Sequence, residues 1–100
     1  MKRIAIAVIA AGAMLAGPAG AADDPRAARN MAASCATCHG TDGKSVGVMT
    51  VLAGYAPEQM IQAFKDFKSG ARPATLMHQF ARGYDEAQVR ALAAYFAAQK

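Results

Sequence analysis

Two thiols and an imidazole stand close together in the stretch Cys35-Ala36-Thr37-Cys38-His39. The spacing matches the pattern C-x-x-C-H, in which two thiols add to the two vinyl groups of one porphyrin. The residue after the second cysteine then lies beneath the porphyrin iron, where an imidazole nitrogen can bind the metal. The stretch therefore predicts covalent attachment of one c-type haem through Cys35 and Cys38, with His39 as an iron ligand.

Paired cysteines also occur in zinc sites and in thiol–disulfide redox centres. A structural zinc site takes four ligands, and Cys35 and Cys38 are the only cysteines of the chain. A thioredoxin-like redox pair is expected within a βαβ pattern, and no such pattern surrounds this pair. Haem attachment is therefore favoured, and a redox or metal-binding pair is the alternative.

The first 22 residues have the pattern of a secretory signal peptide. Lys2 and Arg3 form a positive start, an apolar run follows, and a cleavage site of the A-x-A type ends at Ala21. The apolar run is shorter than the roughly 20 residues that a transmembrane helix needs, so a retained membrane anchor is the less favoured alternative. We therefore predict a cleaved leader over residues 1–22 and a mature protein in the periplasm.

Residues 23–100 are enough for one small domain. The full chain has 100 residues, and loss of the two basic residues of the leader lowers its formal charge from +4 to +2. Such a weak positive charge does not indicate nucleic-acid binding. A domain of this size has a marginal apolar core, which a covalently attached haem would complete. We therefore predict a single haem-bearing domain, with no nucleic-acid partner and no membrane insertion after cleavage.

The haem motif is expected at the end of a helix. Asp24 can cap this helix, and Pro25 suits its first position. One apolar face continues at helical spacing into the motif, through Ala28, Met31, Ala32 and Cys35. A polar, glycine-rich loop follows over residues 40–47. The apolar stretch 47–54 could be a short strand, but no second strand can pair with it, so we expect an extended loop that lines the haem pocket.

Three further helices are expected, which makes the predicted fold class all-α. Pro57 begins the first of them, and Gly70 closes it as a glycine cap. A short helix is expected to start with Thr75 as its cap and to end at Arg82. The capping-box pattern that begins at Asp85 opens the last helix, whose apolar stripe faces the core.

The second iron ligand must come from elsewhere in the chain, and the methionines are the candidates. Met31 is on the helix of the motif, and Met60 is better explained as core packing. Met49 follows the imidazole so closely that the chain would have to cross the porphyrin at once. We therefore predict Met77, which lies beyond a whole helix. His78 is its competitor, but neighbouring residues on a helix point about 100° apart, so we interpret it as a surface histidine.

Several polar side chains could contact the haem edge. Tyr55 could hydrogen-bond a haem propionate, or it could be an amphipathic surface tyrosine. Four cations could surround the exposed edge and guide a partner, although scattered solvated charges are the simpler explanation; they are Lys44, Lys65, Lys68 and Arg72. No catalytic acid–base or nucleophile arrangement is visible, so an enzyme is not predicted.

The order of these elements resembles class I cytochrome c over the whole of residues 23–100. The stretches Cys38–Gly43 and Phe67–Met77 are similar to the cytochrome subunit of flavocytochrome c sulfide dehydrogenases, and also to single domains of cytochrome c4. The resemblance implies three main helices and a short helix packed around one haem. It also implies thioether bonds at Cys35 and Cys38, with His39 and Met77 bound to the iron.

The resemblance further implies an electron-transfer role, with electrons taken from a flavoprotein subunit that oxidises sulfide. A free-standing carrier for an oxidase or another dehydrogenase is the alternative, and a haem enzyme or gas sensor with an open iron position is a third. One departure from the family concerns the proline whose carbonyl usually orients the proximal histidine. Residues 47–54 contain no proline, so we expect a backbone carbonyl near Val48 to take its place.

Overall fold

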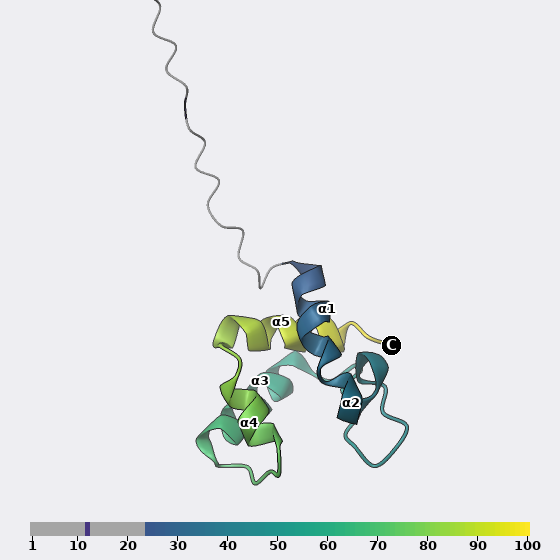
Figure 1. Cartoon of the computed structure of the whole chain (residues 1–100), viewed down its shortest axis with the longest axis vertical. Helices are drawn as coiled ribbons and strands as arrows, with labels where there is room; N and C mark the ends of the chain where they lie inside the picture. Colours follow the sequence, from purple (N-terminus) through teal and green to yellow (C-terminus); the bar gives the residue numbers. More distant parts are fainter. Residues whose placement is uncertain (1–11, 13–23) are drawn as a thin grey trace, which may run out of the picture.

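The computed structural model describes Gly12 and residues 24–100 of the chain. The leader predicted over residues 1–22 lies outside the described residues, apart from Gly12. The regular elements of the described part are all helical, which confirms the predicted all-α class, and none of these helices is long and apolar enough to cross a membrane. They are α1 (Pro25–Ala33), α2 (Ala36–His39), the 3-10 helix η2 (Thr41–Gly43), α3 (Pro57–Ser69), α4 (Met77–Arg82) and α5 (Glu86–Ala97) (Figure 1).

The predicted caps fix the ends of the three main helices. The Asp24 side chain accepts a hydrogen bond of 2.9 Å from the Arg26 N–H at the start of α1. At the start of α5, Asp85 and Gln88 form a capping box, because each side chain accepts from the other residue's N–H. Gly70 ends α3 in the left-handed region at φ 84°. Local sequence therefore determines where these helices begin or end.

The expected helix into the haem motif is interrupted, so that prediction is wrong in detail. α1 ends at Ala33, Ser34 and Cys35 form a turn, and α2 follows as a separate helix of four residues. The Ser34 hydroxyl donates to the Met31 carbonyl at 3.0 Å. A serine bonded to a preceding carbonyl competes with regular helix geometry. Most of the haem motif therefore lies on a short helix separate from α1.

The short helix α4 also starts later than predicted. Its first residue is Met77, its N-cap is Leu76, and Thr75 makes no capping hydrogen bond. Met77 is half-buried and Ala81 is 1% exposed. Burial of these two side chains, rather than a polar cap, is what places the helix, because packing overrides weak local preferences.

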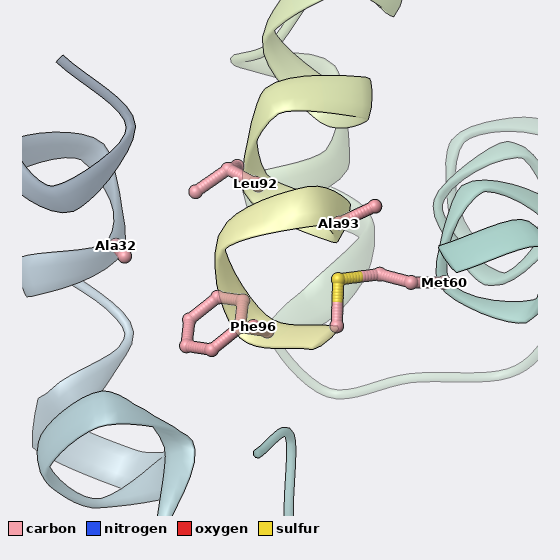
Figure 2. Packing of buried hydrophobic residues seen from close by; sticks show 5 residues of the cluster. All are labelled: Ala32, Met60, Leu92, Ala93 and Phe96. Atoms are coloured by element: carbon pink, nitrogen blue, oxygen red, sulfur yellow. The ribbon is translucent and has the colours of Figure 1, made fainter. Parts of the chain in front are cut away.

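The core is built on both sides of α5, which lies between α1 and α3 (Figure 2). Leu92 and Phe96, 0% and 2% exposed, point toward the side of α1 on which Ala32 lies. Ala93 points the other way, toward Met60 of α3, which is 3% exposed. Burial of a side chain such as Leu or Phe stabilises a fold by about 1.5–3 kcal/mol. The C-terminal helix is therefore the centre of the domain.

The same helix fixes the irregular segment that follows η2. Buried Gly43, at φ 74°, accepts hydrogen bonds from the N–H groups of Leu52 (2.9 Å) and Ala53 (3.2 Å). The Gly54 N–H donates to the carbonyl of Phe96 on α5 at 2.8 Å. Residues 44–54 are thus closed into a loop at both ends, as predicted, and contain no strand.

A polar contact joins η2 to α5. Asp42 has φ 54°, a region where Asp is more common than most residues, and its side chain accepts a hydrogen bond from the Tyr95 hydroxyl. This hydrogen bond raises the pKa of Tyr95, as do partial burial and the charge of Asp42, while Arg29 acts in the opposite direction. The contact adds a second tie between the haem-motif region and the C-terminal helix.

The close fit at Gly43 gives a test of this loop closure. A Cβ added at Gly43 would lie 2.7 Å from Leu52 Cβ and 2.9 Å from Ala53 N. We expect Gly43→Ala to lower the free energy of unfolding by about 2–3 kcal/mol, because it combines overpacking with a strained φ. Gly47→Ala is the matched control, since nothing lies within 4 Å of its added Cβ. Denaturant titration of the two variants should separate them, and equal stabilities would contradict the loop closure.

The Tyr95–Asp42 hydrogen bond predicts a pH-dependent contribution to stability. Because the folded-state pKa of Tyr95 is raised, its contribution is complete below the ordinary tyrosine pKa of about 10 and is lost as the pH rises through the folded-state value. Tyr95→Phe should therefore cost about 1 kcal/mol at neutral pH, and the difference from the parent protein should shrink above pH ~10. Thermal unfolding of the parent protein and of Tyr95→Phe, both with reduced iron, from neutral pH to above pH ~10 measures this difference in stability. A difference that stays constant at high pH would show that the hydroxyl does not contribute in this way.

Candidate functional site

The imidazole of the C-x-x-C-H stretch is held by a backbone carbonyl. His39 Nδ1 lies 2.7 Å from the Thr50 carbonyl oxygen. A carbonyl can only accept, so Nδ1 carries the ring proton and Nε2 keeps a lone pair for a metal. We expected a backbone carbonyl near Val48 to accept from the imidazole, and the acceptor is the carbonyl two residues further on, at Thr50. A threonine carbonyl thus stands where the sequence resemblance implied the carbonyl of a proline.

All four predicted site residues line one cavity of about 320 Å³. Cys35, Cys38 and His39 reach it from the turn after α1 and from α2, while Met77 reaches it from the first turn of α4. In Figure 1 α2 and α4 lie apart from each other below α5. The predicted thiols, imidazole and thioether are therefore gathered around one space from two distant parts of the chain.

The walls of this cavity are mostly apolar and come from three helices and a loop. Aromatic or aliphatic side chains line it from α3, α4, α5 and residues 49–55; they include Leu52, Met60, Phe64, Phe67, Phe80 and Phe96. Its volume is within the range of about 300–1,000 Å³ that is usual for cofactor pockets. Two thiols and an imidazole with a free nitrogen at an apolar cavity are the donor set that haem c requires. The residues present therefore fit this group.

The polar part of the cavity lining is small. Tyr55 lines it and is half-buried, so the expectation that it can reach a bound group is compatible with its position. Tyr84 and Ser34 also line it, with their hydroxyls 3.2 Å apart, and sequence reasoning missed both. Among the four cations considered, Arg72 lines the cavity, whereas Lys44, Lys65 and Lys68 do not.

The two thiols differ in their surroundings. Cys35 is half-buried, and this burial raises its pKa, while a hydrogen bond with Ser34 acts in the opposite direction. Cys38 is exposed. The chain thus presents one sheltered thiol and one accessible thiol on the same cavity, which is consistent with attachment of a single group that enters from outside.

The methionines occupy different environments. Met49 is 42% exposed and precedes Thr50, whose carbonyl holds the imidazole. Met60 lines the cavity too, but it is 3% exposed and belongs to the hydrophobic core, and Met31 packs against that core. Both were expected to be packing residues, and both are. Met77 is half-buried at the start of α4.

The histidine next to Met77 is placed differently from what the sequence suggested. His78 does not line the cavity, in agreement with the expectation that only one of the two neighbours faces it. Its ring is nevertheless half-buried, and Nδ1 is buried without a hydrogen-bond partner within the described residues. The interpretation as a surface histidine is therefore wrong. Helical periodicity gave the direction of the ring but could not show that its Nδ1 is buried.

Residues 22–96 match the family described as cytochrome c oxidase, cbb3-type, subunit III. The chain is 44% identical over 63 residues to the cytochrome subunit of sulfide dehydrogenase from Chlorobaculum tepidum, which covers 63% of this chain and 57% of that protein. It is 36% identical over 87 residues to cytochrome c4 from Pseudomonas aeruginosa, which covers 86% of this chain and 43% of that protein. Cytochrome c-554(548) from Halomonas halodenitrificans is 29% identical over 83 residues, with 79% of this chain and 100% of that protein covered.

The chain thus spans about half of the length of the first two of these relatives. The family match itself extends from the residues before α1 to the end of the buried stripe on α5. It therefore includes every element that surrounds the cavity. Because the match covers most of the sequence, the chain belongs to this family of cytochrome c domains and is an electron-transfer protein with covalently bound haem c.

Proposed function

We propose that this cytochrome is a single-haem electron relay of the periplasm that receives electrons from a flavoprotein sulfide dehydrogenase subunit. In this proposal Cys35 and Cys38 carry the thioethers, and His39 and Met77 bind the iron. The observation that carries it is the single apolar cavity that all four residues line. When bound, haem c supplies one-electron iron chemistry, and the chain holds, orients and shelters it.

The hydrogen bond to Thr50 supports His39 as the proximal ligand. It fixes the tautomer with Nε2 free and holds the ring on the side of the cavity where residues 49–52 lie. Partners of this kind orient a ligating histidine and increase its basicity. Met49 adjoins the acceptor residue, and we therefore assign it to the same side as the imidazole. Met77, on the separate helix α4, is the better candidate for the opposite face.

Histidine and methionine together suit electron transfer rather than catalysis. A thioether sulfur stabilises Fe(II), raises the reduction potential and leaves no open position for small molecules. The apolar walls from α3 and α5 also raise the reduction potential, because an environment of low polarity disfavours the more highly charged oxidised iron. The proposed site would therefore accept electrons readily and react little with other substrates.

The identity to the sulfide dehydrogenase subunit supports the choice of partner. The stretch Arg72-Pro73-Ala74-Thr75 before Met77, on which the sequence resemblance depends, lies wholly on the surface and lines the cavity. A partner that docks at this segment would approach the haem directly. The periplasmic location follows from the leader predicted over residues 1–22.

A free-standing electron carrier is the second candidate function. The observation that favours it is the match to cytochrome c-554(548), because this chain spans the whole length of that relative. A small cytochrome that works alone would use the same cavity and the same four residues. The two candidates differ only in whether a flavoprotein stays bound.

The ligand assignment can be tested with two matched methionine variants. Oxidised cytochromes with methionine-bound iron have a weak charge-transfer absorption band at long wavelength. We expect Met77→Leu to remove this band and to lower the reduction potential, because thioether ligation raises it. Met49→Leu should keep both properties, since Met49 is the neighbour of Thr50, whose carbonyl holds the imidazole. Loss of the band in Met49→Leu, with retention in Met77→Leu, would reverse the assignment.

The choice of partner predicts a stable, flavin-containing complex. Native protein purified from the periplasmic fraction at low salt should elute in size-exclusion chromatography with flavin absorbance, and sulfide should reduce its haem within that fraction. Haem of the isolated cytochrome should not be reduced by sulfide at a comparable rate. Elution as a small flavin-free protein would instead support the free-standing carrier.

A further inference from the structure

One charged side chain stands out in the lining of the haem cavity. Among the described residues that line it, Arg72 is the only one with a permanent charge, and no Asp, Glu or Lys joins it. Neither of the two ion pairs within residues 24–100 includes Arg72, since they join Arg26 to Asp24 and Arg90 to Glu86. A guanidinium without a carboxylate partner thus borders a mostly apolar space.

Backbone and ring contacts hold this arginine in place. Gly70, in the left-handed region, turns the chain back after α3, and the Arg72 N–H donates to the Asp66 carbonyl at 3.1 Å. The guanidinium carbon then lies 4.8 Å from the centre of the Phe67 ring, which also lines the cavity. Stacking on an aromatic face orients a guanidinium while its N–H donors remain free at the edge. Arg72 is therefore pre-positioned toward the cavity.

We propose that Arg72 binds a propionate carboxylate of the haem, and that Phe67 is its positioning residue. The inference rests on the proposed haem attachment at Cys35 and Cys38. A porphyrin with two propionates brings two negative charges to a cavity whose lining contains one free cation within the described part of the chain. A guanidinium pairs with a carboxylate through two parallel N–H donors, a geometry that lysine cannot reproduce. The exposed Arg72 side chain keeps this pair at the rim, where a carboxylate stays hydrated.

The test compares Arg72→Gln with Lys68→Gln in the haem-loaded protein. Both changes remove one positive charge near the end of α3, but Lys68 is exposed and does not line the cavity. We expect Arg72→Gln to shift the propionate bending mode in the resonance Raman spectrum. It should also change the ratio of oxidised to reduced protein at a fixed potential by about threefold to tenfold in favour of the oxidised form, because an unpaired carboxylate stabilises Fe(III). Lys68→Gln should leave the propionate mode unchanged.

Two further variants test the same contact with milder changes, in case Arg72→Gln fails to fold or to take up haem. Arg72→Lys retains the charge, so we expect it to shift the propionate mode with little change in the oxidised-to-reduced ratio. Phe67→Leu should shift the mode less than Arg72→Gln, because the guanidinium remains but loses its stacking face. A propionate mode that is the same in parent, Arg72→Lys and Phe67→Leu proteins would overturn the proposal.

Failure of this inference differs in its signature from failure of the proposed function. If Arg72 does not bind a propionate, the parent protein keeps its long-wavelength methionine band and the variants leave the propionate mode unchanged. If the ligand assignment is wrong, the Met77 and Met49 variants report it through the methionine band, whatever the propionate mode does.

Discussion

The packing of Phe96 is the constraint on which the site depends. Its ring is 2% exposed and would lie 3.0 Å from a Cβ at Gly43, and its carbonyl accepts from the Gly54 N–H. One residue of the last helix thus holds both ends of the loop that contains Thr50. Because the Thr50 carbonyl fixes the imidazole of His39, the orientation of a group near the N-terminal end of the domain depends on the C-terminal helix.

The rest of the cavity depends on segments without regular secondary structure. The walls from α3 and α5 are helical, whereas the residues that line the space from 44–56 and 70–76 belong to loops. A few hydrogen bonds hold these loops instead of the continuous ladder of a helix, so what they enclose contributes to their conformation. A domain this small buries few large side chains, and a covalent porphyrin therefore acts as part of its core.

Several elements could be predicted from the sequence because short-range chemistry determines them. The caps at Asp24, Asp85 and Gly70 depend on residues within one turn, and the C-x-x-C-H spacing carries its own chemical meaning. Met77 lines the cavity with the thiols and the imidazole, but Met49 and Met60 line it as well, so Met77 as the iron ligand stays a prediction.

Other features could not be predicted, for physical reasons. Every residue has a carbonyl, so nothing in the residue types distinguishes Thr50 from Val48 as the acceptor for His39. The break before α2 depends on how one serine hydroxyl is used. The burial of His78 Nδ1 could not be predicted, because periodicity within α4 gives the direction of a side chain but not what covers it. The acceptor for His39 and the burial of Nδ1 depend on how the chain folds, whereas the break before α2 depends on one of several local uses of a serine.

The group that accepts from the imidazole is the backbone carbonyl of Thr50. The side chains of the loop therefore do not take part in this hydrogen bond. Any residue at this position offers the same oxygen, so the outward-facing valines at 46, 48 and 51 can be replaced without removing the acceptor. What the imidazole responds to is the path of the backbone. A shift of the loop by a few tenths of an ångström would change the hydrogen bond and, through it, the electron density on the opposite ring nitrogen. Contact with another molecule at this surface could therefore adjust the centre without touching any of its ligands.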